Sequence, residues 1–308
     1  MPINNINSLT PPFLKKGDVV EIIASSKFVN KNDVNLAIQS IEAAGFNVRI
    51  NSSLFNKLDV FSGSFHNRIT ILQESLDNII SKALLFARGG YGFIHLIDHI
   101  DFSKFIKNPK WIIGFSDMTI LLTHLQLNYQ IQSIHGPMAY NFLTTDLWSR
   151  TQLFSLLTGN LEEVKFDSFP LNKYGVSEGV ILGGNLSILS SLVGSSSLPS
   201  NLDKYILFIE EIDEYLYHVE RMLYTLDRAG VLHNLKGLII GGMTNTLDNE
   251  IPFGKTVSEL IYDVTKKYNY PICFNFPAGH DYQNTPFIIG AKIQMDINSH
   301  FSIIKYIK

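Results

Sequence analysis

Short apolar runs alternate with longer amphipathic segments through the first half of the chain. The apolar runs predict strands at Val19–Ala24, Phe46–Ile50, Ala83–Ala87 and Trp111–Gly114. Between them, apolar residues recur with helical spacing over Val34–Ala44, Asn67–Ile80 and Met118–Leu127. Because the runs are apolar throughout instead of alternating, we predict a mostly parallel sheet that is covered by helices on both faces.

The second half begins after a stretch without clear periodicity. Residues 144–179 are rich in turn-forming residues, and we expect a connection between two domains there. Beyond it, the pattern predicts strands over 205–209 and 238–240, a helix over about 217–226, and short strands with turns from Pro271 onwards. The sequence thus predicts an α/β protein. Its N-terminal domain, 1–143, holds the parallel sheet, and a smaller C-terminal α/β domain rich in β-structure occupies 180–308.

Composition and charge narrow the classes of partner. The 308 residues are 45% hydrophobic and 17% charged, and Lys+Arg 25 against Asp+Glu 28 gives a formal net charge of −3. This balance indicates no basic surface for nucleic acid or an anionic membrane, so we expect neither as a partner.

The single cysteine, Cys273, excludes an intrachain disulfide and a thiolate metal cluster. Residues 1–7 lack the basic segment followed by an apolar segment that is typical of an export leader, and no apolar run reaches about 18 residues. We therefore expect a cytoplasmic protein.

A hydroxyl group follows the predicted strand at Trp111–Gly114. The order Gly114-Phe115-Ser116-Asp117 places Ser116 between a strand and a helix. In α/β sheets, ligands gather at the carboxyl ends of strands, and the N-terminus of the following helix offers amide donors for an oxyanion. Ser116 is therefore a candidate nucleophile. The alternative is that Ser116 only caps the helix, with Asp117 as an acid that is favourable to the helix dipole.

A nucleophilic serine needs a base and an acid that orients the base. His280 lies in Pro277-Ala278-Gly279-His280, a loop-forming segment, and catalytic groups commonly lie on loops. Glu210 follows the apolar strand Tyr205–Ile209 directly, so its carboxylate is expected at the end of that strand. The order Ser116, Glu210, His280 is also the order of α/β hydrolases. For Glu210 the alternative is an acid that caps the next helix.

Glycines follow the predicted strand Ala83–Ala87 in the segment Arg88-Gly89-Gly90-Tyr91-Gly92, which leads into a predicted helix through His95. Glycines at such a junction let backbone amides approach a ligand closely. The spacing matches neither of the two common nucleotide-phosphate motifs. We expect a loop that binds an oxyanion or a substrate carboxylate, with a tight turn for helix packing as the alternative.

Seven blocks, in order and at plausible spacing, resemble the LD-carboxypeptidase family of serine peptidases. This family also includes immunity proteins that hydrolyse microcin C and related peptidyl nucleotides. The resemblance covers about Gly17 to Lys292. The blocks are Arg88-Gly89-Gly90-Tyr91-Gly92, Gly114-Phe115-Ser116-Asp117, His135-Gly136-Pro137-Met138, Gly183-Gly184-Asn185-Leu186, Leu207-Phe208-Ile209-Glu210-Glu211, Glu220-Arg221-Met222-Leu223 and Gly279-His280.

The resemblance implies a two-domain α/β serine carboxypeptidase in which Ser116 is the nucleophile, Glu210 the charge-relay acid and His280 the general base. It implies that the enzyme releases the terminal D-alanine from muropeptide tetrapeptides in cytoplasmic murein recycling, through an acyl-enzyme and without a metal or other cofactor. A muropeptide or related small peptide would be the substrate, and a homodimer is common in the family. The resemblance also implies that the backbone amides of Asp117 and Gly90 donate to the oxyanion. It implies substrate contacts at Arg88, Gly89, Tyr91 and Asn185.

Other functions stay open. A hydrolase of microcin C-type peptidyl nucleotides would use the same triad and would need an aromatic platform for the nucleobase. Trp111 lies on the predicted nucleophile strand and Trp148 in the connection, which favours the muropeptide. A catalytically silent peptide-binding protein would share the scaffold, and the glycine spacing argues against a dinucleotide-dependent dehydrogenase.

Overall fold

The computed structural model describes residues 8–307 and divides into two compact units. The N-terminal unit runs to Asn160 and includes Asn284–Ile288, and the C-terminal unit comprises Leu161–Gln283 and the chain from Ile289 onwards. The passage from Asn160 to Leu161 lies within the predicted connection 144–179, which also contains a helix, a strand and the start of a second strand. Residues 1–7, on which the expectation of no export leader depends, lie outside the described residues. Among those described, no helix has the length and apolarity needed to cross a membrane.

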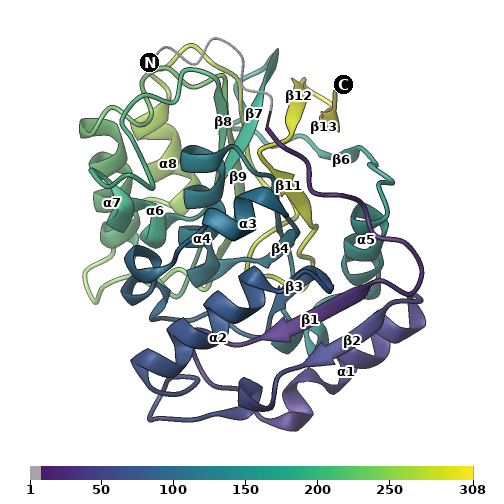
Figure 1. The fold of residues 1–308 in the computed structure, drawn as a ribbon. Helices are drawn as coiled ribbons and strands as arrows, with labels where there is room; N and C mark the ends of the chain where they lie inside the picture. Colours follow the sequence, from purple (N-terminus) through teal and green to yellow (C-terminus); the bar gives the residue numbers. More distant parts are fainter. Residues whose placement is uncertain (1–7, 308) are drawn as a thin grey trace. The chain divides into compact units, whose positions relative to one another are not determined.

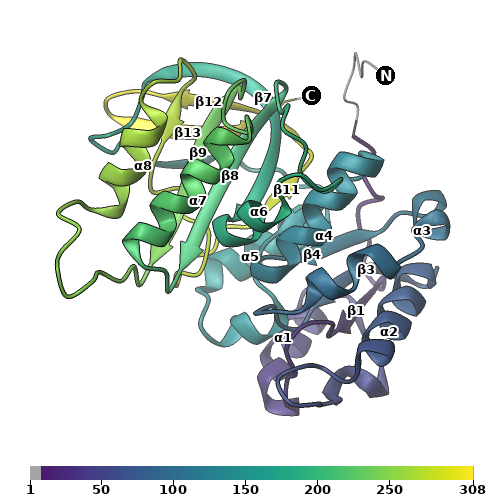
Figure 2. The same ribbon diagram turned by 90° about the vertical axis from the view of Figure 1, so that its left-hand side faces the viewer.

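The N-terminal unit is built on a sheet with the order β11-β5-β4-β3-β1-β2. Its pairs from β2 through β1, β3 and β4 to β5 are parallel. Figure 2 shows α1 and α2 on opposite sides of β1. The elements are β1 (Val19–Ile23), α1 (Lys31–Ala43), β2 (Asn47–Ile50), α2 (Phe65–Asp77), β3 (Ser81–Phe86), α3 (Ser103–Lys107), β4 (Trp111–Gly114), α4 (Thr119–His124), β5 (Ser133–His135), α5 (Leu147–Leu157) and β11 (Phe287–Ile289).

The central strands of this sheet are buried on both faces, as the apolar runs predict. All four residues of β4 and the last four of β3 are buried, because helices cover the sheet on both sides. The helix expected through His95 is a pair of short 3₁₀ turns, Phe93–His95 and Ile97–His99, with backbone bonds from Leu96 to Phe93 and from His99 to Leu96. These bonds span three residues instead of four, which makes the segment two 3₁₀ turns and not an α-helix.

The C-terminal unit has a mixed sheet with the order β10-β9-β8-β7-β12-β13-β6. The strands from β7 to β10 are parallel, and β12, β13 and β6 pair antiparallel. Figure 1 shows α6, α7 and α8 gathered on one side of β7, β8 and β9. The elements are β6 (Val164–Asp167), β7 (Gly175–Asn185), α6 (Leu186–Leu192), β8 (Tyr205–Ile212), α7 (Leu216–Arg228), β9 (Gly237–Thr244), α8 (Val257–Thr265), β10 (Ile272–Cys273), β12 (Lys292–Ile297) and β13 (Phe301–Tyr306).

The two sheets confirm the predicted α/β class, with a parallel sheet flanked by helices and a second α/β unit rich in β-structure. The strand over Tyr205–Ile209 is longer than predicted. It continues through Glu210 and Glu211 to Ile212, so that both glutamates lie inside β8 and are buried. Hydrogen bonds to these carboxylates make the burial possible, and hydropathy alone does not reveal them.

Candidate active site

Ser116 lies at a sharp turn in the N-terminal unit, where β4 ends and α4 approaches. Its backbone has φ +60°, in the left-handed region that residues with a side chain rarely occupy. A 3₁₀ turn over Ser116–Met118 leads into α4, with the Met118 amide donating to the Phe115 carbonyl at 3.1 Å. Such strain costs about 1–3 kcal/mol and is concentrated at functional sites. A strained serine between a strand and a helix is the arrangement of a nucleophile elbow.

The glycine loop packs directly against Ser116 and the amide of Asp117. A Cβ atom at Gly89 would lie 3.1 Å from the Ser116 Cβ and 3.3 Å from the Asp117 nitrogen. A side chain at 89 would therefore crowd that amide. The structure thus brings together two segments that are more than twenty residues apart in sequence, and both were expected to contribute to an oxyanion site.

Two predicted substrate contacts on this loop have partners within the N-terminal unit. The guanidinium of Arg88 lies 4.3 Å from the ring centre of Tyr140, and its Nη1 donates to the Phe28 carbonyl at 3.4 Å. Tyr91 is 51% exposed, and its hydroxyl lies 3.3 Å from Nε2 of His95. Arg88 therefore supports the loop, whereas the Tyr91 ring is accessible to a ligand.

In the C-terminal unit, the predicted acid and base are joined by a hydrogen bond. Nδ1 of His280 lies 2.7 Å from Oε2 of Glu210. The Glu210 side chain is fully buried and that of His280 is 15% exposed. Because the carboxylate can only accept, it fixes the proton on Nδ1 and leaves Nε2 as the basic nitrogen of the ring. This pair has the chemistry of the base and acid of a serine hydrolase.

The loop that carries His280 is held to the end of the sheet. The Gly242 amide of β9 donates to the Ala278 carbonyl at 2.9 Å, and the Thr244 hydroxyl donates to Asp281 at 2.8 Å. Gly279 has φ +132°, and a Cβ there would lie 3.1 Å from Glu210 Oε2. A side chain at 279 would therefore push against the carboxylate that holds the imidazole.

Glu211, the next residue on β8, supports a different part of the unit. Its carboxylate accepts from Nδ2 of Asn185 at 2.8 Å, from the Ser187 amide at 2.7 Å and from the Ile212 amide at 2.9 Å. The pairing of β8 with β9 shifts register between Ile209 and Glu211, and the two neighbouring glutamates have different partners. Asn185, predicted as a substrate contact, also caps α6 by accepting from the Ile188 amide at 3.2 Å.

Burial and neighbouring charge set the protonation of these groups. Burial lowers the pKa of His280, but the charge and hydrogen bond of Glu210, with the charges of Glu211 and Asp213, raise it above its usual value of 6.5 overall. Burial, together with the charge of Glu210, raises the pKa of Glu211 to about 7. The imidazole is thus more basic than a free histidine, as a general base for a serine hydroxyl should be.

The sequence reasoning gave no role to three polar residues that make hydrogen bonds within the two units. They are Glu211, Ser26 and Arg68, all buried. Glu211 was visible only as the neighbour of Glu210. Ser26 follows the first strand, as Ser116 follows the fourth, and this shared position could have pointed to it. Arg68 lies inside an amphipathic helix, where its partners on other segments leave no local signal. Among the described residues, no group of three or more histidine, cysteine or acidic side chains is arranged to hold a metal ion.

Family models match both units of the chain. The LD-carboxypeptidase N-terminal domain matches residues 20–136, and the LD-carboxypeptidase C-terminal domain matches residues 178–295. A probable murein peptide carboxypeptidase of Bacillus subtilis is 30% identical over 309 residues, which cover 96% of this chain and 94% of the relative. The murein tetrapeptide carboxypeptidase of Pseudomonas aeruginosa is 23% identical and covers 91% of this chain and 93% of its own.

Solved structures agree with this fold. The muramoyltetrapeptide carboxypeptidase from Oxalobacter formigenes has a TM-score of 0.86 at 24% identity, covering 94% of this chain and 99% of its own. The wild-type microcin self-immunity protein MccF has a TM-score of 0.85 at 21% identity, covering 97% of this chain and 99% of its own. The chain belongs to the LD-carboxypeptidase family of serine peptidases.

Proposed function

We propose that this protein is an LD-carboxypeptidase that releases the terminal D-alanine from muropeptide tetrapeptides during murein recycling in the cytoplasm. The observation that carries the proposal is the 2.7 Å hydrogen bond between His280 and the buried Glu210. The relatives named as murein peptide carboxypeptidases supply the substrate class. The single cysteine, buried in β10, is compatible with a reducing compartment, and the family resemblance suggests a homodimer.

In this proposal, Ser116 Oγ attacks the carbonyl carbon of the bond before the terminal D-alanine. Nε2 of His280 takes the hydroxyl proton, and Glu210 stabilises the imidazolium that forms. The backbone amides of Asp117 and Gly90 donate to the oxyanion. His280 then passes the proton to the departing amino group, and a water molecule activated by the same imidazole hydrolyses the acyl-enzyme. Every step uses groups of this chain, the peptide and water.

The experiment is mass spectrometry of a muropeptide tetrapeptide after incubation with the wild type and with Ser116→Ala. We expect loss of the terminal alanine with the wild type only, because the variant lacks the attacking oxygen. Ser103→Ala, which removes an exposed serine at the start of α3 in the same unit, is the matched control and should keep full activity. A tetrapeptide that ends in L-alanine tests the stereochemistry. Release by Ser116→Ala at the wild-type rate would refute the assigned nucleophile.

A peptidyl-nucleotide hydrolase is the second candidate, because the fold also matches MccF with a TM-score of 0.85. The tryptophans do not strengthen it. Trp111 is completely buried, with its indole nitrogen donating to the Pro12 carbonyl, whereas Trp148 on α5 is 43% exposed. A peptidyl adenylate in the same assay separates the candidates, since cleavage of it alone would favour this second function. No cleavage of either substrate by folded protein would favour a silent peptide-binding protein.

A further inference from the structure

One buried carboxylate joins three loops at the carboxyl edge of the N-terminal sheet. Oδ2 of Asp117, which follows β4, accepts from the Ser26 hydroxyl at 2.6 Å and from the Phe93 amide at 2.9 Å. Ser26 follows β1, and Phe93 comes directly after the glycine loop that follows β3. Asp117 is 1% exposed. The Asp117 side chain therefore links the nucleophile turn to the loops that follow β1 and β3.

Arg68 completes the network from α2. Its Nη1 donates to the carbonyls of Ser25 and Gly92, each at 3.1 Å, and its guanidinium lies 4.5 Å from the ring centre of Phe61. It thus fixes the same two loops through the residues next to Ser26 and Phe93. Burial raises the pKa of Asp117, while its hydrogen bonds and the charges of His95 and Arg68 oppose this shift.

The two proposed oxyanion donors need such a support. The Asp117 amide belongs to the nucleophile turn, whereas the Gly90 amide belongs to a loop whose glycines offer no side chains as anchors. Oxyanion donors must be held to within about 0.5 Å of their productive position. The bond from the Phe93 amide to Asp117 is a direct link between the end of the glycine loop and the nucleophile turn.

We propose that the Asp117 side chain is a positioning residue that, with Ser26, aligns the glycine loop with Ser116 so that the two amides meet one oxyanion. The inference rests on the proposed function. It assigns the carboxylate no contact with substrate, since Oδ2 is used by Ser26 and Phe93 and the side chain is buried.

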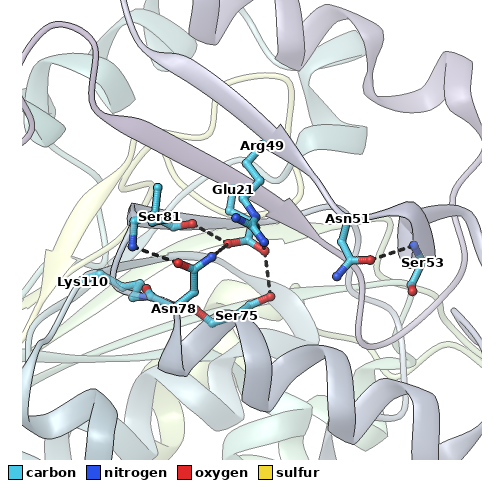
Figure 3. Close-up of polar contacts among 9 residues, drawn as sticks. Glu21, Arg49, Asn51, Ser53, Ser75, Asn78, Ser81 and Lys110 are labelled. Atoms are coloured by element: carbon cyan, nitrogen blue, oxygen red, sulfur yellow. Dashed lines mark hydrogen bonds and ion pairs between the residues drawn. The ribbon is translucent and has the colours of Figure 1, made fainter.

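A second buried carboxylate in the same unit provides a matched control. Glu21 of β1 accepts from the Ser75 hydroxyl at 3.0 Å and the Ser81 hydroxyl at 2.5 Å, and Arg49 lies 3.7 Å away (Figure 3). Ser81 begins β3, whereas the glycine loop follows its end. Since β1 and β3 are parallel, the Glu21 network lies toward the amino edge of the sheet and the Asp117 network at the opposite edge.

The test compares Ser26→Ala with Ser75→Ala, each of which removes a buried serine hydroxyl that donates to a buried carboxylate. We expect Ser26→Ala to lower kcat about tenfold with little change in KM, and Ser75→Ala to lower thermal stability with kcat unchanged. Binding of a boronic acid analogue of the tetrahedral intermediate should weaken about as much as kcat falls in Ser26→Ala, while binding of the product peptide stays constant.

Asp117 itself provides a rescue test. Asp117→Ala should lower kcat about 100-fold, the cost of losing one oxyanion donor. Asp117→Asn should restore most of this loss, because its amide oxygen can still accept from Ser26 and Phe93. Equal losses of kcat in Ser26→Ala and Ser75→Ala, or an Asn variant as inactive as the Ala variant, would overturn the proposal.

Labelling of Ser116 by a fluorophosphonate separates this inference from the proposed substrate. The reagent forms a tetrahedral phosphorus adduct whose oxygen uses the same amide donors. If the wild type is labelled but cleaves no muropeptide, the proposed substrate is wrong, and slower labelling of Ser26→Ala than of Ser75→Ala still supports the positioning role. If the wild type is neither labelled nor active, the nucleophile assignment and this inference both fail.

Discussion

The two units contribute different kinds of machinery to the proposed reaction. In the N-terminal unit, Ser116 depends on backbone shape, namely a φ of +60° and a glycine at 89 that leaves room beside an amide. In the C-terminal unit, His280 depends on charge, namely a buried carboxylate at 2.7 Å. A small added side chain disturbs the backbone arrangement around Ser116. Protonation of His280, or replacement of a carboxylate oxygen of Glu210, instead removes the charge interaction. Substitutions in the two units should therefore fail in different, measurable ways.

Loss of the charged pair should have the largest effect. His280→Ala should reduce turnover by about 10⁵-fold, because no group then accepts the serine proton. Glu210→Gln should reduce it by about 10³-fold to 10⁴-fold, because the ring remains but the imidazolium loses its stabilising charge. Turnover is measured as D-alanine released from the tetrapeptide over time.

The control for the charged pair is His300→Ala, which removes an exposed histidine from the turn between β12 and β13 in the same unit. It should retain wild-type turnover. If His280→Ala also retained it, a different base would have to be assigned.

Filling the space beside the Asp117 amide should have the next largest effect. Gly89→Ala places a Cβ 3.1 Å from the Ser116 Cβ and 3.3 Å from the Asp117 nitrogen. We expect kcat to fall about 100-fold with KM little changed, since an oxyanion donor matters most in the transition state. Steady-state kinetics with the tetrapeptide measure both constants.

Gly17→Ala is the control for Gly89→Ala. Gly17 has φ +88° with open space around its Cβ position, so alanine there is strained but touches nothing. This variant should lose about 1 kcal/mol of stability and keep its kcat. A Gly89→Ala variant with normal kcat would mean that the oxyanion does not bind beside the Asp117 amide.

The same division explains how far sequence reasoning reached. The buried strands β3 and β4 are recognisable because parallel strands that are covered on both faces are apolar throughout. Ser116 was predicted as the nucleophile from its place between such a strand and a helix. Both features are local patterns in the sequence, and such patterns are sufficient to propose a nucleophile in the N-terminal unit.

The parts that escaped prediction depend on contacts between distant segments. Arg68 looks like an exposed helix residue, yet it is buried, because the carbonyls of Ser25 and Gly92 accept hydrogen bonds from its guanidinium. Glu210 marks the end of an apolar run, yet the strand continues through it, since a hydrogen bond from His280, seventy residues away, makes its burial tolerable. No window of sequence contains both partners, so periodicity could not reveal either contact.

The smallest predicted effect, a shift in pH dependence, separates the two units most cleanly. The general base must be neutral, so activity should fall as the pH falls through the pKa of His280. Because Glu210 and neighbouring acids raise that pKa above 6.5, the acidic limb of the wild type should lie above pH 6.5. Glu210→Gln removes the strongest of these charges and leaves the burial that lowers the pKa, so its limb should move to lower pH. The profile of kcat/KM between about pH 5 and 9 measures both positions.

Two consequences make this shift decisive for the comparison. The loss of activity caused by Glu210→Gln should become smaller as the pH falls, because His280 of the wild type is protonated at a higher pH than His280 of the variant. The loss should shrink by about tenfold for each unit of difference between the two pKa values. Gly89→Ala changes shape and leaves the charges around His280 intact, so its profile should be lower at every pH but keep the wild-type limb. If the acidic limb moved equally in Glu210→Gln and Gly89→Ala, it would report a group other than His280. The assignment of charge to one unit and backbone shape to the other would then be wrong.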